Sequence, residues 1–151
     1  MPKLKDREFI SVFAPGAMRL AIFREMEEEG QKMIRIKDYN HIGIVVRDLE
    51  KSKLFYGEIL GLKTIFRPPF NFPGHWYQVG PGTQLHLMVY DEAIPRTMRH
   101  TALEVEDFDK ALEHLKKSGV TIVEGPGKRY DGSDFLFCKD PDGNLVEITK
   151  H

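Results

Sequence analysis

Apolar and polar positions alternate most regularly between His41 and Val46. Ile42, Ile44 and Val46 stand at every second position, so in a β-strand they share one face, and His41 lies on the other. Asp48 follows this strand and is suited to cap a helix through its side-chain carboxylate. The pattern predicts a half-buried strand that leads directly into a helix.

The predicted helix has apolar or small residues at helical spacing up to Ile59, and Gly61 supplies a stop signal. Three more strands are expected after it, separated by segments rich in proline and glycine. The pairs Pro68-Pro69 and Pro73-Gly74 bracket a loop between the first two of these strands. The three strands are predicted at residues 62–67, 75–79 and 83–90.

The strand and the helix return 59 positions later, so the chain contains an internal repeat. Without a gap, His41 falls on His100 and Asp48 falls on Asp107. The helix of the second copy has an apolar face that starts at Phe108. Three strands should follow it, at residues 120–124, 135–139 and 145–149. Each copy is therefore strand, helix, strand, strand, strand, and two copies together can cover one core.

Turn segments separate the predicted strands of the second copy, as they do in the first. Gly125-Pro126-Gly127 is expected to open a loop that continues to Asp131. The segment 140–144 reads Asp-Pro-Asp-Gly-Asn, which suits a tight turn in a closing hairpin. We therefore expect a domain at residues 39–151, with modules at 39–90 and 99–150.

Residues 1–38 lie outside the repeat and are predicted to form an N-terminal extension. Part of it should be helical, between Ala17 and Glu29, before the stop signal of Gly30. Functionally this extension could be a dimer arm or a lid over a pocket. The alternative is a peripheral helix that covers apolar surface.

Composition and charge exclude several classes of partner. The 151 residues carry a formal net charge of -1, with 41% hydrophobic and 30% charged residues. This balance gives no electrostatic reason to expect nucleic acid or an anionic membrane as a partner. No apolar run approaches the roughly 18 residues of a membrane span. The single cysteine, Cys138, excludes an internal disulfide and fits a cytoplasmic protein.

The repeat also pairs four side chains of the types that bind metals. His41 and His100 open the first strand of each copy, while His86 and Glu147 lie on the last strand, 61 positions apart. His86 and Glu147 each stand between apolar neighbours, so the neighbours face the core and the polar group faces the other side of the sheet. If a pseudo-twofold axis relates the two copies, all four side chains can converge.

Three imidazoles and a carboxylate suit a divalent transition metal, namely zinc, iron, manganese, nickel or cobalt. Two histidines and one carboxylate would suit non-haem iron(II), whereas calcium prefers oxygen ligands. Any one of these histidines alone is more simply a strand residue with a satisfied hydrogen bond. The symmetry-matched positions of all four favour a metal site.

Four stretches of the chain resemble the vicinal oxygen chelate superfamily, which includes glyoxalase I, fosfomycin-resistance proteins, methylmalonyl-CoA epimerase, extradiol dioxygenases and bleomycin-resistance proteins. The stretches are HIGIVVRD at 41–48, FYGEILGL at 55–62, RHTALEVED at 99–107 and FCKDPDGNLVEI at 137–148. The resemblance implies an α+β fold in which two βαβββ modules form a cupped mixed sheet around one metal ion. It also implies a homodimer.

The same resemblance implies roles for individual residues. His41, His100 and Glu147 match the family's metal ligands. His86 departs from glyoxalase I, which typically has a carboxylate or amide there that helps the metal-bound base to shuttle a substrate proton. A histidine could bind the metal or act as the base. Glu147 and His86 are the catalytic candidates, together with Glu104, which is either a second base or a rim carboxylate.

Two kinds of side chain are candidates for binding a small-molecule substrate. Aromatic and amide groups on strand faces could wall a pocket, or pack the core instead. These are Trp76, Gln78, Phe135 and Phe137. Cationic and phenolic groups near loops could bind a phosphonate or carboxylate, or form a solvated surface. These are Arg67, Lys128, Arg129 and Tyr130.

Four functions are compatible with this interpretation. The first is a glyoxalase I-like lyase or isomerase, in which a metal acts as Lewis acid on a substrate with vicinal oxygens. The others are thiol transfer to or hydration of an epoxide, as in fosfomycin resistance, extradiol ring cleavage, and metal-free drug binding. The short chain argues against the dioxygenase, and the complete ligand set argues against the metal-free binder. We expect the first.

Overall fold

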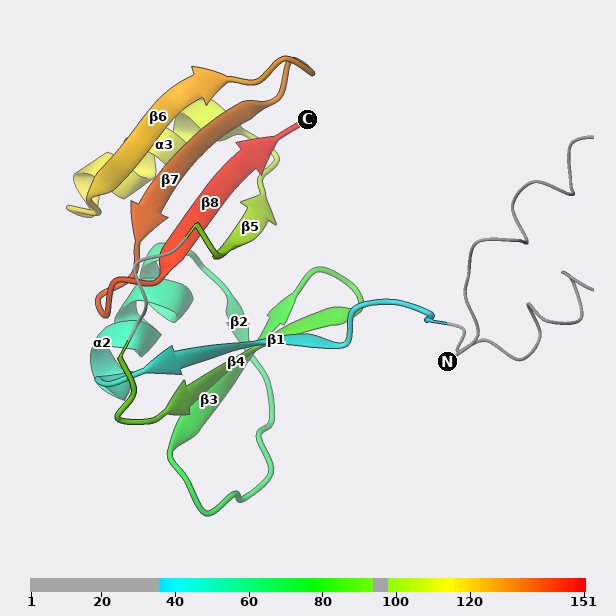
Figure 1. The fold of residues 1–151 in the computed structure, drawn as a ribbon, viewed down its shortest axis with the longest axis vertical. Helices are drawn as coiled ribbons and strands as arrows, with labels where there is room; N and C mark the ends of the chain where they lie inside the picture. The colour runs from blue at the N-terminus through cyan, green and yellow to red at the C-terminus, as the bar shows by residue number, and fades with distance from the viewer. Residues whose placement is uncertain (1–35, 94–97) are drawn as a thin grey trace, which may run out of the picture. The chain divides into compact units, whose positions relative to one another are not determined.

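The computed structural model describes residues 36–93 and 98–151, and the chain from Asp38 to His151 forms one compact unit. Within this unit the same order of strands and helix occurs twice, as the repeat predicts (Figure 1). The predicted helix at residues 17–29 lies outside the described residues. No helix in the two described ranges is long and apolar enough to cross a membrane.

The first copy forms a mixed four-stranded sheet with the strand order β1-β4-β3-β2, in which only β1 and β4 are parallel. Asp48 caps the first helix as predicted, because its carboxylate accepts a hydrogen bond from the Lys51 backbone N–H at 3.1 Å. The helix then continues as a π-helical segment, η1. The elements are β1 (His41–Val46), α2 (Leu49–Lys53), η1 (Leu54–Ile59), β2 (Lys63–Thr64), β3 (Gly74–Val79) and β4 (Thr83–Val89).

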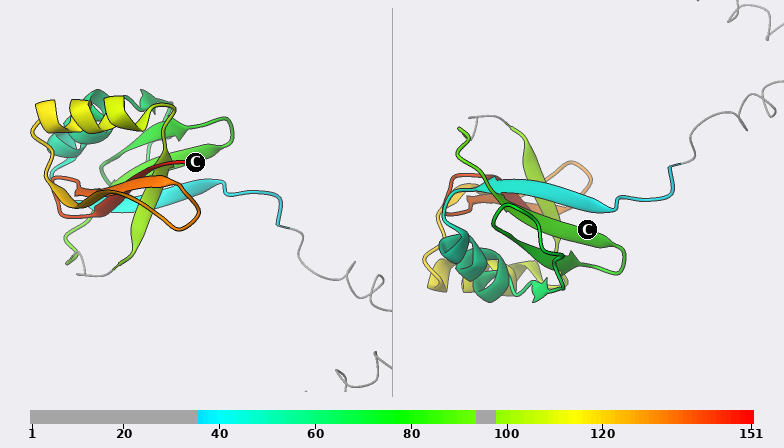
Figure 2. Two further views of the ribbon diagram at one scale, coloured as in Figure 1. Left: turned by 90° about the horizontal axis from the view of Figure 1, so that it is seen from above. Right: turned by 90° about the horizontal axis from the view of Figure 1, so that it is seen from below.

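The second copy repeats this topology with the strand order β5-β8-β7-β6, and β5 runs parallel to β8. Asp107 caps its helix through a hydrogen bond from the Lys110 backbone N–H. This helix lies across one face of its sheet (Figure 2) and contacts β8. The elements are β5 (His100–Glu104), α3 (Phe108–Lys117), β6 (Ile122–Lys128), β7 (Asp134–Lys139) and β8 (Leu145–Lys150).

Two predicted boundaries are wrong. The strand expected at 62–67 is limited to Lys63–Thr64, although the Ile65 N–H still donates to the Trp76 carbonyl. The segment Gly125-Pro126-Gly127 does not open a loop but lies inside β6. Register shifts against β7 occur between Ile122 and Gly127. Since β6 is the outer strand of its sheet, it can carry a proline and a bulge.

One hydrophobic core serves both copies. Leu85 and Leu87 of β4 belong to it, and so do Val146 and Ile148 of β8. The polar residues between them, including His86, are not part of this cluster. The predicted alternation is therefore confirmed: each sheet turns its apolar face to the shared core and its polar face away from it. The fold is α+β, built from two mixed sheets.

Candidate metal centre

The first pair of candidate ligands lies on the polar face of the β1–β4 sheet. The imidazole rings of His41 and His86 stack with centroids 4.2 Å apart and planes within 12°. The contact follows from the parallel register, in which His86 lies opposite Gly43 on β1. Because Gly43 has no side chain, the ring of His41 can lie over His86.

His86 is also covered on its other side. Trp76 lies directly opposite it on β3, and the two rings stack at 3.8 Å with planes 3° apart. His86 is only 8% exposed. Burial is the largest cause that lowers its pKa below the usual value, and His41 and Arg67 lower the pKa further. The imidazole is therefore neutral near pH 7, which is the form that binds metal or accepts a proton.

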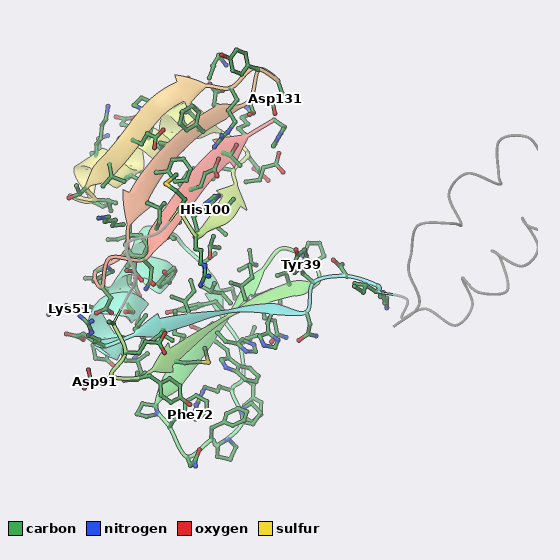
Figure 3. The ribbon with its side chains drawn as sticks, in the orientation of Figure 1. Tyr39, Lys51, Phe72, Asp91, His100 and Asp131 are labelled. Carbon is green, nitrogen blue, oxygen red and sulfur yellow. The ribbon has the colours of Figure 1, made fainter. Side chains whose placement is uncertain are left out.

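The second pair lies on the polar face of the β5–β8 sheet. His100 Nε2 is 3.0 Å from Glu147 Oε2, and the Glu147 residue is 6% exposed. His100 sits at the start of β5 (Figure 3). Its other nitrogen, Nδ1, is 2.8 Å from the Met98 carbonyl oxygen. Phe137 meets the His100 ring edge-on at 5.1 Å.

Arg129 belongs to this second group of residues. Its Nη2 donates to Glu147 Oε1 at 2.5 Å, so the carboxylate contacts His100 through one oxygen and Arg129 through the other. The guanidinium carbon lies 4.5 Å from the centre of the Phe135 ring. A buried carboxylate needs such partners, because an unpaired buried charge is costly.

The two pairs do not meet within one chain. Among the described residues, no three His, Cys, Asp or Glu side chains lie close enough together to hold a metal ion. The reason is the shared core: both sheets turn their apolar faces inward, so their polar faces point away from each other. The convergence expected from the repeat does not occur within the single chain that the structure describes.

Each histidine nevertheless has the arrangement of a metal ligand. A carbonyl or amide oxygen can only accept, so the imidazole nitrogen that faces it carries the proton and the other nitrogen keeps its lone pair. In His100, Nδ1 faces the Met98 carbonyl and Nε2 faces the Glu147 carboxylate, so Nε2 would bind a metal in place of its hydrogen bond to that carboxylate. In His41 and His86 the proton-carrying nitrogens face Asn40 and Gln84, each at 2.8 Å. The donor set therefore fits a divalent transition metal, as two half-sites.

The other candidate residues are distributed unevenly around these pairs. Trp76, Phe137 and Arg129 contact the candidate ligands directly. Glu104 is exposed and pairs with His151, and Gln78 donates to the Gly80 and Thr83 carbonyl groups of the β3–β4 turn.

The remaining cationic and phenolic candidates lie in loops or beside them. Arg67 packs on the rings of Phe70 and Phe72. Lys128 forms an ion pair with Asp134 at 2.8 Å. Tyr130 is fully exposed.

The sequence interpretation missed the residues that orient the histidines. Gln84 precedes His86 by two positions on the same strand face, so its contact could have been inferred from the alternation. Asn40 is adjacent to His41, so its contact could also have been inferred. The Met98 carbonyl is a backbone group, and no sequence signal identifies it.

Comparisons with known proteins identify the family of this chain. The model of the Glyoxalase/Bleomycin resistance protein/Dioxygenase superfamily matches residues 38–148. The chain belongs to this superfamily, and the expected resemblance is confirmed.

Three similar proteins illustrate its range. "Glyoxylase I 4" of Arabidopsis thaliana is 29% identical over 136 residues, covering 82% of this chain and 76% of its own. "Glutathione transferase FosA" of Serratia marcescens is 32% identical over 121 residues, covering 75% of this chain and 80% of its own. A mutant of the fosfomycin resistance protein FosX of Listeria monocytogenes, complexed with Mn(II) and 1S,2S-dihydroxypropylphosphonic acid, shares the fold with a TM-score of 0.67 at 24% identity, covering 77% of this chain and 93% of that one.

Proposed function

We propose that this protein is a metal-dependent lyase or isomerase of the glyoxalase I kind. The observation that carries the proposal is the pair formed by His100 Nε2 and Glu147 Oε2, 3.0 Å apart, in which the Met98 carbonyl orients the His100 ring by accepting from Nδ1. A histidine and a carboxylate aligned in this way are half of a transition-metal site. His41 and His86 supply the other half.

Two copies of the chain are needed to complete the site, since no single chain brings the pairs together in its described part. His41 and His100 lie on β1 and β5, each of which is one of the two outer strands of its sheet. An outer strand has unpaired backbone groups along one edge and is available to a partner. A twofold dimer can therefore place the first pair of one copy beside the second pair of the other, and it does so twice.

A divalent metal at this site would supply Lewis-acid stabilisation of negative charge on a substrate oxygen. The chain's own residues orient the substrate and move its proton. His86 is neutral near pH 7 because burial lowers its pKa, so it is suited either to ligate or to accept a proton. Trp76 covers one face of that ring and keeps water from it. Glu104 is exposed beside His151, so we assign it no proton transfer.

Metal analysis of the purified protein tests the proposal. The wild-type protein, stripped and reloaded with zinc, nickel, manganese or cobalt, should hold one ion per chain, and His100→Ala or Glu147→Ala should lose most of that affinity. His114→Ala is the matched control, because His114 donates to the Ile59 carbonyl between the two copies of the repeat. It should retain the metal. A wild-type protein that cannot be loaded would contradict the whole assignment.

The second candidate function is thiol transfer to, or hydration of, an epoxide that bears an anionic group. It is favoured by the 32% identity to the Serratia protein and by the cation Arg129 beside Glu147. Loaded enzyme should be assayed with the hemithioacetal of methylglyoxal and glutathione, with fosfomycin plus a thiol, and with catechol. Turnover of the hemithioacetal supports the first function, and turnover of fosfomycin supports the second.

A further inference from the structure

The two carboxylate oxygens of Glu147 have different partners. Oε2 faces His100 Nε2, while Oε1 accepts a hydrogen bond from Arg129 Nη2. The Glu147 side chain is only 8% exposed, so few water molecules can take the place of these partners. Together they fix the rotation of the carboxylate and compensate the burial of its charge.

Arg129 is held in place by the sheet as well as by its loop. The guanidinium carbon lies 4.5 Å from the centre of the Phe135 ring and 5.9 Å from that of Phe137. Its backbone N–H donates to the Ser133 carbonyl at 2.9 Å, which closes the loop that contains Asp131 (Figure 3). Arg129 therefore reaches Glu147 from a fixed direction, and His100 reaches it at the other oxygen.

We propose that Arg129 is a positioning residue that gives the two oxygens of Glu147 separate functions. It occupies Oε1 and leaves Oε2, beside His100, as the single oxygen that binds the metal. The inference rests on the proposed metal site. Two donors on one tetrahedral metal ion with bonds of about 2.1 Å lie roughly 3.4 Å apart, so His100 Nε2 and Glu147 Oε2, now 3.0 Å apart, need to separate only slightly. A metal can meet both donors while Arg129 stays in place.

Cobalt(II) provides a readout that does not depend on activity, because its visible absorption changes with the number of ligands. Arg129→Met frees Oε1 to bind as well, so the number of ligands and with it the cobalt spectrum should change. Arg129→Ala should give the same change, which guards against misfolding of either variant. Arg129→Lys, which keeps a charged donor on a long side chain, should restore the wild-type spectrum.

Lys128→Met is the matched control. It removes one positive charge from the adjacent position, but Lys128 pairs with Asp134 and not with Glu147. Its cobalt spectrum should equal that of the wild type. A wild-type spectrum in Arg129→Met and Arg129→Ala would overturn this inference and leave the metal site intact. Failure of the wild-type protein to bind cobalt or any of the other metals would overturn both proposals.

Discussion

The hydroxyl group of Tyr56 donates a hydrogen bond to Asp140 Oδ2 at 2.9 Å, across 84 positions of the chain. Tyr56 lies in η1 and is 1% exposed, while Asp140 begins the turn between β7 and β8 and is 4% exposed. The other carboxylate oxygen of Asp140 accepts three backbone N–H groups, from residues 142–144. This carboxylate therefore organises the turn of one copy and ties it to the helix of the other.

Removing the Tyr56 hydroxyl should destabilise the protein without changing its packing. Tyr56→Phe leaves Asp140 with one buried oxygen less satisfied, so the free energy of unfolding should fall by about 1–3 kcal/mol. Urea unfolding measures this change. Tyr130→Phe, on a fully exposed tyrosine, should stay within about 0.5 kcal/mol of the wild type. Equal stability of the two variants would show that the bond contributes nothing.

Mixing two defective variants should restore part of the metal site if the site spans two chains. His41→Ala and His100→Ala each spoil both sites of a homodimer. In a mixed dimer, one site carries both substitutions and the other carries neither. About half of the wild-type metal content should return in the isolated mixed dimer, and about a quarter in an unfractionated mixture with random pairing. Co-expression with two affinity tags, followed by metal analysis, makes the measurement. No recovery in the isolated mixed dimer would place the site within a single chain.

Metal binding should change the fluorescence emission of Trp76. It is the only tryptophan in the sequence, and its ring stacks on His86 at 3.8 Å. Binding of a metal near His86 should change the tryptophan emission in a saturable way, and cobalt or nickel should quench it. His41→Ala should weaken the response by lowering the affinity. Metal binding with unchanged emission would argue against a site beside His86.

Alkaline pH should destabilise the fold through Cys138. Burial raises the pKa of this thiol from its usual 9.0 to about 11, and Asp140 adds to the shift. Because the folded protein keeps the proton to higher pH than the unfolded chain, the stabilising effect is complete below pH 9 and is lost as the pH rises through 11. At about 1.4 kcal/mol for each pKa unit, this effect amounts to roughly 3 kcal/mol. Unfolding curves at several pH values should show a smaller alkaline loss for Cys138→Ala, and equal losses would contradict the assignment.

The sequence by itself determined the modules and the facing of their strands. The alternation in β1 indicates which face of the strand is buried, because burial of one sheet face forces a period of two. The repeat of His41 at His100 indicates that the same order of elements occurs twice. The same period assigned Leu85 and Leu87 to the core and His86 to the opposite face, as observed. The caps at Asp48 and Asp107 could also be predicted, since they depend on contacts only three residues apart.

Tertiary structure decided which of the candidate ligands contact each other. In the repeat His41 corresponds to His100. In the structure, however, His41 contacts His86, and His100 contacts Glu147. Local patterns specify the face on which a side chain lies, whereas the distance between two faces depends on how the sheets pack. Both sheets bury their apolar faces in one core, so their polar faces are separated within the chain. The position of Arg129 on Glu147 likewise depends on a loop and two rings that periodicity does not place.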